Sequence, residues 1–212
     1  DKVNQLYNFY IPICFKIFKL HKFENKTIVI SLSGGQGAGK STISEILKII
    51  LSSIYKLNVV NFSLDDFYKT FSERKKLSKF IHPLFMTRGV PGTHDYIMLL
   101  KIIKKLKYNK FKKMIIPKFD KSKDDRFKKN FWQKITKKPD VIIFEGWCVG
   151  AKPQNKKDLK KPINQLEKKE DIKLTWRKKI NNELNTNYKK IFKLIDYKIF
   201  IKVPSFKYVF RW

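Results

Sequence analysis

The amino-acid sequence predicts an α/β fold of three layers, with a mostly parallel β-sheet flanked by helices on both faces. Short apolar segments of strand length alternate with segments of helical periodicity along the chain, and this alternation is typical of parallel sheets. We find no internal repeat and no linker that would divide the 212 residues. We therefore expect one domain over residues 1–212.

The expected elements follow from the apolar pattern, taken in chain order. Continuous apolar runs that end in Gly, Pro or acidic residues predict buried strands. Apolar residues spaced three and four positions apart predict helices between them, and Thr93 is expected to cap one of these. The predicted elements are an N-terminal helical segment in residues 1–26, with a helix over 3–22 interrupted near Pro12; strands at 27–33, at 58–66, within 113–120 as a short strand stopped at Pro117, at 139–146 and at 196–204; helices at 40–56, after the loop 87–95, and at 172–192; and a Lys-rich, mobile surface insertion at 151–170.

The formal net charge of +30 is the most extreme compositional feature. Only five of the 48 basic residues are arginine, and the abundant residues Lys, Asn, Ile, Phe and Tyr all use A/T-rich codons. The lysines are spread along the whole chain instead of being interleaved with aromatic residues in one patch, as in a nucleic-acid-binding surface. The charge therefore favours a genome-composition effect over selection for a nucleic-acid partner.

Two scarce residue types mark positions of interest. The eight glycines all fall within residues 34–39, 89–92 and 146–150, where the backbone is expected to tolerate no side chain. Arginine is retained where a planar, two-pronged donor is expected. The retained arginines are Arg74, Arg88, Arg126, Arg177 and Arg211.

Residues 31–42, SLSGGQGAGKST, fit the phosphate-binding pattern G-x-x-x-x-G-K-S/T and lie between an apolar strand and a helix. Backbone N–H groups and the helix N-terminus would surround the phosphates of a nucleoside triphosphate. Lys40 would reach the β- and γ-phosphates, and Ser41 would bind Mg²⁺. The domain is therefore predicted to be a P-loop NTPase, with nucleotide-binding residues Gly34, Gly35, Gln36, Gly37, Ala38, Gly39, Lys40, Ser41 and Thr42.

Acidic residues follow two of the predicted strands. In SLDDFYKT (63–70), Asp65 or Asp66 could orient an acceptor hydroxyl and take its proton, with Tyr68 in the pocket wall. In DVIIFEGWCVG (140–150), Glu145 stands where P-loop enzymes place the acid that meets Mg²⁺. The expected magnesium ligands are Ser41, Glu145 and Asp65.

Two loops and one helix supply the remaining candidates. RGVPGTHD (88–95) and PKFDKSKDDR (117–126) carry groups suited to an anionic substrate with hydroxyls, and Arg177 could stabilise charge on the transferring phosphoryl. A tight turn, an exposed charged loop and a solvated helix face remain the structural alternatives. The expected substrate-binding residues are Asp66, Tyr68, Arg88, His94, Asp95, Asp120, Arg126 and Trp147; the catalytic residues are Asp65, Lys40 and Arg177.

With the phosphate loop, SLDDFYKT, RGVPGTHD, PKFDKSKDDR and FEGWCVG in this order, the chain resembles the D-glycerate 3-kinase family. That family includes fungal ATP-binding relatives and is grouped with uridine kinase, pantothenate kinase and phosphoribulokinase. The resemblance implies ATP-dependent, Mg²⁺-assisted phosphorylation of the 3-hydroxyl of D-glycerate to 3-phosphoglycerate. It favours Asp65 over Asp66 as the base, matches Glu145 to the magnesium acid, and matches Arg177 to a lid arginine.

Other functions stay open at this stage. They are a kinase of a nucleoside or another hydroxy acid, a nucleic-acid-binding P-loop ATPase, and a relative that binds ATP for interaction only. An N-K-x-D match at 155–158, the base-reading element of GTPases, lies in the Lys-rich insertion and not after an apolar strand.

The cysteine count, the hydropathy and the chain ends complete the prediction. Cys14 and Cys148 form no disulfide framework or metal cluster, and no run of about 18 apolar residues is present. We expect a cytoplasmic monomer or weak dimer that acts on a small molecule and does not contact a membrane. The first methionine is Met86, and the chain ends in SFKYVFRW, which we expect to be the start of a helix. We therefore expect a fragment with a truncated C-terminus.

Overall fold

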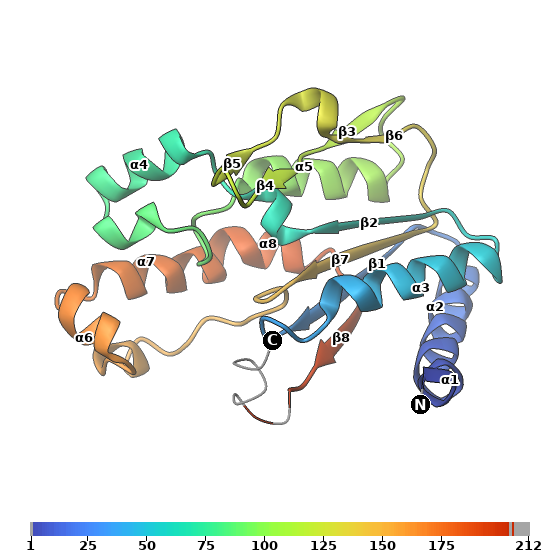
Figure 1. Ribbon diagram of the computed structural model, residues 1–212, viewed down its shortest axis with the longest axis horizontal. Coiled ribbons are helices and arrows are strands. Elements are labelled where there is room, and N and C mark those ends of the chain that lie inside the picture. The colour runs from blue at the N-terminus through green and yellow to red at the C-terminus, as the bar shows by residue number, and fades with distance from the viewer. Residues whose placement is uncertain (1, 204, 206–212) are drawn as a thin grey trace.

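The computed structural model describes residues 2–203 and residue 205. Its main sheet has four parallel strands in the order β2-β7-β1-β8, which confirms the predicted parallel α/β fold (Figure 1). The strands are β1 (Ile28–Gly34), β2 (Val59–Ser63), β7 (Val141–Gly146) and β8 (Tyr197–Ile201).

The strand register brings the functional segments to one edge of this sheet. Glu145 of β7 pairs with Leu32 of β1 on one side and with Ser63 of β2 on the other. Because the strands are parallel, the residues that follow β1, β2 and β7 all emerge at the same carboxyl edge, where ligands of such sheets bind.

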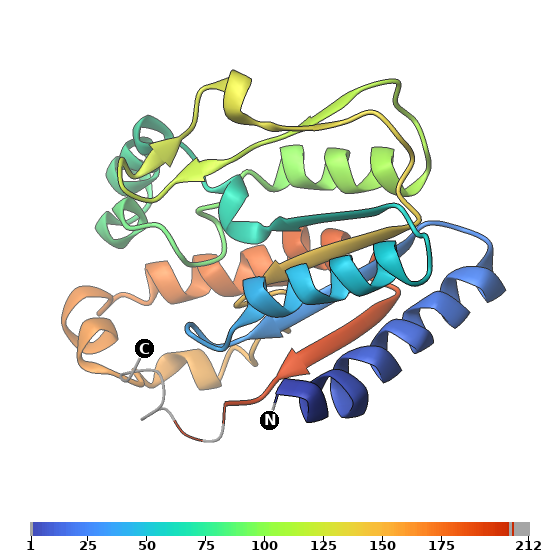
Figure 2. The ribbon, with the colours of Figure 1, turned by 45° about the vertical axis from the view of Figure 1, so that its right-hand side comes forward.

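Helices cover both faces of the sheet, as Figures 1 and 2 show. Alternate residues of β1 and β7, such as Ile28 and Ile143, pack with α2 (Ile11–Glu24) and α3 (Lys40–Ser53). The other face, with Val29 and Phe144, packs with α5 (Tyr96–Lys107) and α8 (Lys189–Phe192). Burial on both faces explains why β1 and β7 are nearly continuous apolar runs.

The N-terminal segment is one helical rod in which a π-helical turn replaces the predicted interruption. It consists of α1 (Lys2–Gln5), the π-helical turn η1 (Leu6–Tyr10) and α2. Pro12 lies in the first turn of α2, where an N–H would have no helical partner. The rod ends at Asn25, which adopts a left-handed conformation with φ 46°.

The segment after β2 departs most from the prediction. The strand ends at Ser63 and not at residue 66, and the two aspartates lie in the 3₁₀ turn η2 (Leu64–Phe67). The helix α4 (Phe71–Phe80), capped by Thr70 and Glu73, was not predicted and leads into the 3₁₀ turn η3 (Pro83–Met86). The cap of α5 is Asp95 and not Thr93, because Asp95 accepts the backbone N–H of Met98.

The predicted short strand in residues 113–120 stops at Pro117, as expected, but it lies outside the main sheet. Pro117 separates β3 (Met114–Ile116) from β4 (Phe119–Asp120). These short strands pair antiparallel with β6 (Gln133–Ile135) and β5 (Asp125–Arg126), and the 3₁₀ turn η4 (Lys129–Phe131) connects the two pairs.

The Lys-rich segment 151–170 contains regular structure, namely the 3₁₀ turn η5 (Asp158–Lys160) and the helix α6 (Gln165–Glu170). Glu167 is buried within it, so the segment is not simply a solvated surface loop. The predicted helix over 172–192 is confirmed as α7 (Thr175–Glu183), the π-helical turn η6 (Leu184–Tyr188) and α8.

Within the described part of the chain, no helix is long and apolar enough to cross a membrane. The predicted helix at SFKYVFRW and the retained Arg211 fall mostly outside the described residues.

Candidate active site

The phosphate loop lies between β1 and α3, as its sequence predicts. Gly37 and Gly39 both have φ 75°, a left-handed conformation that suits glycine. A Cβ on Gly34 would lie 2.9 Å from the Ile201 carbonyl oxygen of β8. The Lys40 ammonium donates to the Gly35 carbonyl oxygen at 2.7 Å, and partial burial lowers the pKa of Lys40.

The first helical turn of α3 meets the end of β7 through Ser41 and Glu145. The Ser41 hydroxyl donates to Glu145 Oε1 at 2.8 Å, and Glu145 is only 8% exposed. Burial raises the pKa of Glu145, while hydrogen bonds from Ser41 and Ser63 and the charge of Lys40 oppose the rise. The two side chains offer hydroxyl and carboxylate oxygens beside the phosphate loop, which are the ligands that Mg²⁺ prefers; the residues therefore fit that ion.

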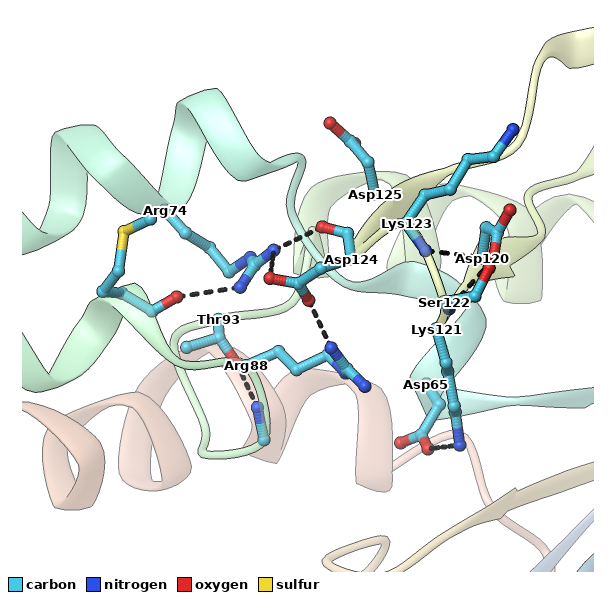
Figure 3. A network of polar contacts seen from close by, with 12 residues as sticks. Asp65, Arg74, Arg88, Thr93, Asp120, Lys121, Ser122, Lys123, Asp124 and Asp125 are labelled. Carbon is cyan, nitrogen blue, oxygen red and sulfur yellow. Dashed lines mark hydrogen bonds and ion pairs between the residues drawn. The ribbon is translucent and has the colours of Figure 1, made fainter.

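The two aspartates of η2 have different surroundings. Asp66 Oδ2 accepts the backbone N–H of Ser63 at 3.1 Å and so closes a capping box. Asp65 instead directs its carboxylate at the Lys121 ammonium, 2.8 Å away (Figure 3). Burial tends to raise the pKa of Asp65, but Lys121 and the Tyr68 hydroxyl hold it below its usual value. Asp65 is thus the ionised carboxylate of the site, and Asp66 is the cap of the turn.

The side chains of Tyr68 and His94 are both buried. The two rings stack with centroids 4.5 Å apart, and His94 is fully buried. The Tyr188 hydroxyl accepts the Gly92 N–H at 3.0 Å and lies 2.6 Å from His94 Nδ1. The other ring nitrogen, His94 Nε2, has no hydrogen-bond partner among the described residues.

Burial also lowers the pKa of His94 to about 3, so the ring is neutral at physiological pH. In this structure the His94 ring is closed off from solvent and contacts Tyr188 and Tyr68, and its direct binding of substrate hydroxyls stays a prediction.

Arg88 lies beside an open cavity and joins the network in Figure 3. The cavity has a volume of about 430 Å³ and is lined by Phe71, Met86, Thr87, Arg88 and Asp124. The guanidinium of Arg88 is paired with Asp124. Asp124 in turn is held by the fully buried Arg74, which donates to its carboxylate at 2.8 Å and to its carbonyl oxygen at 2.6 Å.

The remaining predicted substrate contacts mainly support the backbone. Arg126 donates to the Tyr68 carbonyl oxygen at 2.8 Å and to Asp95 at 3.3 Å. Asp120 Oδ1 accepts the backbone N–H and the hydroxyl of Ser122. Trp147 is 46% exposed, and its indole N–H donates to the Gly89 carbonyl oxygen at 3.0 Å. The last contact joins two of the three glycine-containing stretches.

Arg177 does not reach the phosphate loop in this structure. Its side chain is 7% exposed, and it donates to Asp171 through Nε at 2.9 Å and to Glu167 through Nη1 at 3.4 Å. Asp171 is 1% exposed. Burial tends to raise the pKa of Asp171, but hydrogen bonds from the backbone of Trp176 and from Arg177 keep it below its usual value. In this structure Arg177 is therefore an internal ion-pair partner of two buried acids, and its catalytic role stays a prediction.

Comparison with known proteins gives the family. The model of the phosphoribulokinase / uridine kinase family matches residues 29–186, which include every site residue that the sequence predicts. The chain belongs to this family. It is a P-loop kinase, and ATP is its nucleotide.

The kinase is similar to an uncharacterized kinase of Schizosaccharomyces pombe, mug58, at 34% identity over 92% of this chain and 71% of that protein. It is 30% identical to the chloroplastic D-glycerate 3-kinase of Arabidopsis thaliana over 98% of this chain, but spans only 47% of that protein. Among solved structures, the D-glycerate 3-kinase of Cryptococcus neoformans superimposes with a TM-score of 0.78 at 28% identity, covering 94% of this chain and 73% of that one.

Sequence reasoning missed three partners of the kinase's site. Lys121 lies within the predicted loop 117–126, but its pairing with Asp65 was not expected. The roles of Arg74 and Asp124 in orienting Arg88 were not expected either. The scarcity of arginine was a usable signal, because Arg74, Arg126 and Arg177 each make two or more hydrogen bonds, as predicted for a planar donor.

Proposed function

We propose that this kinase transfers the γ-phosphate of ATP to the 3-hydroxyl of D-glycerate and forms 3-phosphoglycerate. The observation that carries the proposal is the convergence of Lys40, Ser41, Asp65 and Glu145 at the carboxyl edge of the sheet, with the arginine-lined cavity of Arg88 in the neighbouring loop. The similarity to two D-glycerate 3-kinases supports the choice of acceptor.

The nucleotide side of the reaction uses the loop Gly34–Thr42. Backbone N–H groups of the loop and the N-terminus of α3 bind the phosphates, and the Lys40 ammonium leaves the Gly35 carbonyl oxygen to meet their charge. Ser41 and Glu145, with Asp65 near them, would hold Mg²⁺. Bound there, the ion would neutralise charge on the phosphate oxygens and orient them.

The acceptor side uses Asp65. Its carboxylate is ionised and accepts the proton of the acceptor hydroxyl, whose oxygen forms a bond to the γ-phosphorus. The bond from that phosphorus to the β,γ-bridging oxygen breaks, and its electron pair leaves with ADP. Cys148 is not expected to act as a covalent nucleophile, because burial raises the pKa of its thiol to about 12 and a neutral thiol is a poor nucleophile.

Arg88 is suited to the carboxylate of a hydroxy acid. Its side chain is 31% exposed and lines the cavity. Asp124 pairs with only one nitrogen of the guanidinium, Nη1. A planar guanidinium binds a carboxylate through parallel hydrogen bonds. Two arginines facing one aspartate also leave one local positive charge to attract an anionic acceptor.

The proposal is tested with purified protein, Mg-ATP and a panel of D-glycerate, uridine, pantothenate and glycerol. Turnover of D-glycerate is expected, whereas turnover of uridine alone would establish a nucleoside kinase. Hydrolysis of ATP that DNA or RNA stimulates, with affinity falling steeply as salt rises, would instead establish a nucleic-acid-dependent ATPase.

The variant Asp65→Asn tests the assignment of the base. We expect kcat to fall by about 10²–10⁴-fold, the usual contribution of a general base, while the affinity for an ATP analogue stays within a few-fold. The matched variant Asp66→Asn keeps a capping oxygen and is expected to retain most activity. Equal turnover by the two variants would remove Asp65 as the base.

The proposal extends to a cytoplasmic monomer or weak dimer. Cys14 and Cys148 are both free and buried, which suits a reducing compartment. Sedimentation of the purified chain at several concentrations measures the oligomeric state.

A further inference from the structure

Lys121 lies in the turn of a small hairpin formed by β4 and β5, and the backbone of this hairpin is held firmly. Arg74 donates to the Asp124 carbonyl oxygen, Arg126 donates to the Tyr68 carbonyl oxygen, and the Phe127 N–H donates to the Lys118 carbonyl oxygen. The Asp120 carboxylate accepts N–H groups within the turn. The backbone that carries Lys121 is therefore fixed from several directions.

The Lys121 side chain, in contrast, can move. It is 62% exposed, and its only ion pair among the described residues is with Asp65, 2.8 Å away. Figure 3 shows the side chain extending from the hairpin to Asp65. A pair between exposed or partly exposed groups contributes little free energy, so a stronger anion can displace the carboxylate.

The Lys121 ammonium also lies toward the phosphate loop. Its partner Asp65 lies just after β2, whose last residue Ser63 pairs with Glu145. Glu145 in turn accepts the Ser41 hydroxyl of the phosphate loop at 2.8 Å, so Lys121 reaches the same carboxyl edge of the sheet as that loop. A phosphate bound at Lys40 therefore lies within the electrostatic range of Lys121 as well. The cation that the sequence suggested for the transferring phosphoryl was Arg177, but that guanidinium is occupied by Asp171 and Glu167.

We propose that Lys121 is a catalytic residue of the phosphoryl transfer, which pairs with Asp65 before ATP binds and with the γ-phosphate afterwards. This inference rests on the proposed kinase function and on Asp65 as its base. The movement of the Lys121 ammonium from Asp65 to the γ-phosphate has two effects. It places positive charge on the oxygens where negative charge develops, and it frees the Asp65 carboxylate to accept the hydroxyl proton.

The first test measures nucleotide binding and needs no acceptor. Affinities for ADP and for a non-hydrolysable ATP analogue, both with Mg²⁺, are measured by calorimetry in the wild type, Lys121→Gln and the control Lys123→Gln. Lys123 is a neighbouring lysine on the same turn, so the control removes the same charge. We expect Lys121→Gln to reduce the preference for the analogue over ADP by roughly tenfold, as for a lost charged hydrogen bond, and the control to leave it unchanged.

The second test measures turnover with D-glycerate, or with whichever panel acceptor the wild type phosphorylates. Lys121→Gln is expected to lower kcat by about 10²-fold, as when one preorganised donor is lost, with KM for the acceptor changed less than threefold. Lys123→Gln is expected to stay within twofold of the wild type.

Chemical rescue separates the charge from the fold. In Lys121→Cys, alkylation with 2-bromoethylamine rebuilds a side chain of nearly the same length as lysine that ends in an ammonium. We expect this treatment to raise the kcat of the variant at least tenfold. The native Cys14 and Cys148 are buried, and burial raises the pKa of each to about 12, so the introduced thiol reacts selectively.

An unchanged analogue-to-ADP preference in Lys121→Gln would overturn the proposal, as would a kcat equal to that of Lys123→Gln or a failure of alkylation to restore activity. A wild type that does not phosphorylate D-glycerate would refute only the acceptor, because the binding measurement still decides the role of Lys121.

Discussion

Replacing Arg177 by methionine distinguishes its role in stability from a role in catalysis. The change removes the guanidinium that donates to Asp171 and Glu167, two acids that are 1% and 8% exposed. Breaking a buried ion pair from one side costs about 3–5 kcal/mol, because a charge remains buried without compensation. For a domain of this size each kcal/mol shifts Tm by about 2–4 °C, so Arg177→Met is expected to lower Tm by roughly 6–20 °C.

Thermal unfolding followed by circular dichroism measures this shift, with kcat determined well below the Tm of each variant. The control is Lys178→Met, which removes an exposed positive charge from the same helix and is expected to change Tm by only a few degrees. A kcat near that of the wild type in the folded Arg177→Met variant is expected. A loss of kcat of a hundredfold or more with an unchanged Tm would refute the structural role and restore Arg177 as the phosphoryl-facing arginine.

Two further predictions concern glycine and histidine. Gly146→Ala should lower the free energy of unfolding by about 1–3 kcal/mol, the usual cost of overpacking, because its Cβ would lie 2.8 Å from both Leu64 Cβ and Val149 Cγ2; urea titration measures this, and a midpoint equal to that of the wild type would contradict the close contact. His94 has a folded pKa of about 3 against an ordinary value of 6.5, so the unfolded chain binds the proton first. The free energy of unfolding should therefore fall as the pH drops from 6.5 toward 3, by up to about 1.4 kcal/mol per pH unit. Denaturation at pH 7, 5.5 and 4.5 measures the slope, and His94→Asn with an equally steep slope between pH 6.5 and 5 would exclude His94 as its source.

The sequence predicts the central sheet well because each of its strands carries its own signal. β1 and β7 are buried on both faces and thus read as continuous apolar runs, and the glycines of the phosphate loop and Glu145 mark their ends. The helix α4 lacks such a signal: FSERKKLSKF is largely polar, and only its Arg74 is buried. Its start is visible only in the capping pair Thr70 and Glu73.

The candidate site is less predictable, because partners far apart in the chain decide what each residue does. Asp65 and Asp66 are neighbours with the same chemistry, and only the 3₁₀ turn directs one to Lys121 and the other to the Ser63 N–H. Arg177 has the residue type and the helical position expected of a lid arginine. Its pairing with Asp171 and Glu167 depends on how α6 and α7 pack, which local sequence patterns do not encode.

The firm attachment of the β4–β5 hairpin has a thermodynamic consequence for ligand binding. Arg74 is fully buried and fixes Asp124, which in turn orients Arg88. The backbone and side-chain entropy of this arrangement is lost when the chain folds, not when an acceptor arrives. An anion that reaches Arg88 therefore meets a partner that is already ordered, and its binding entropy should be less unfavourable than that of a site assembled from an unstructured loop.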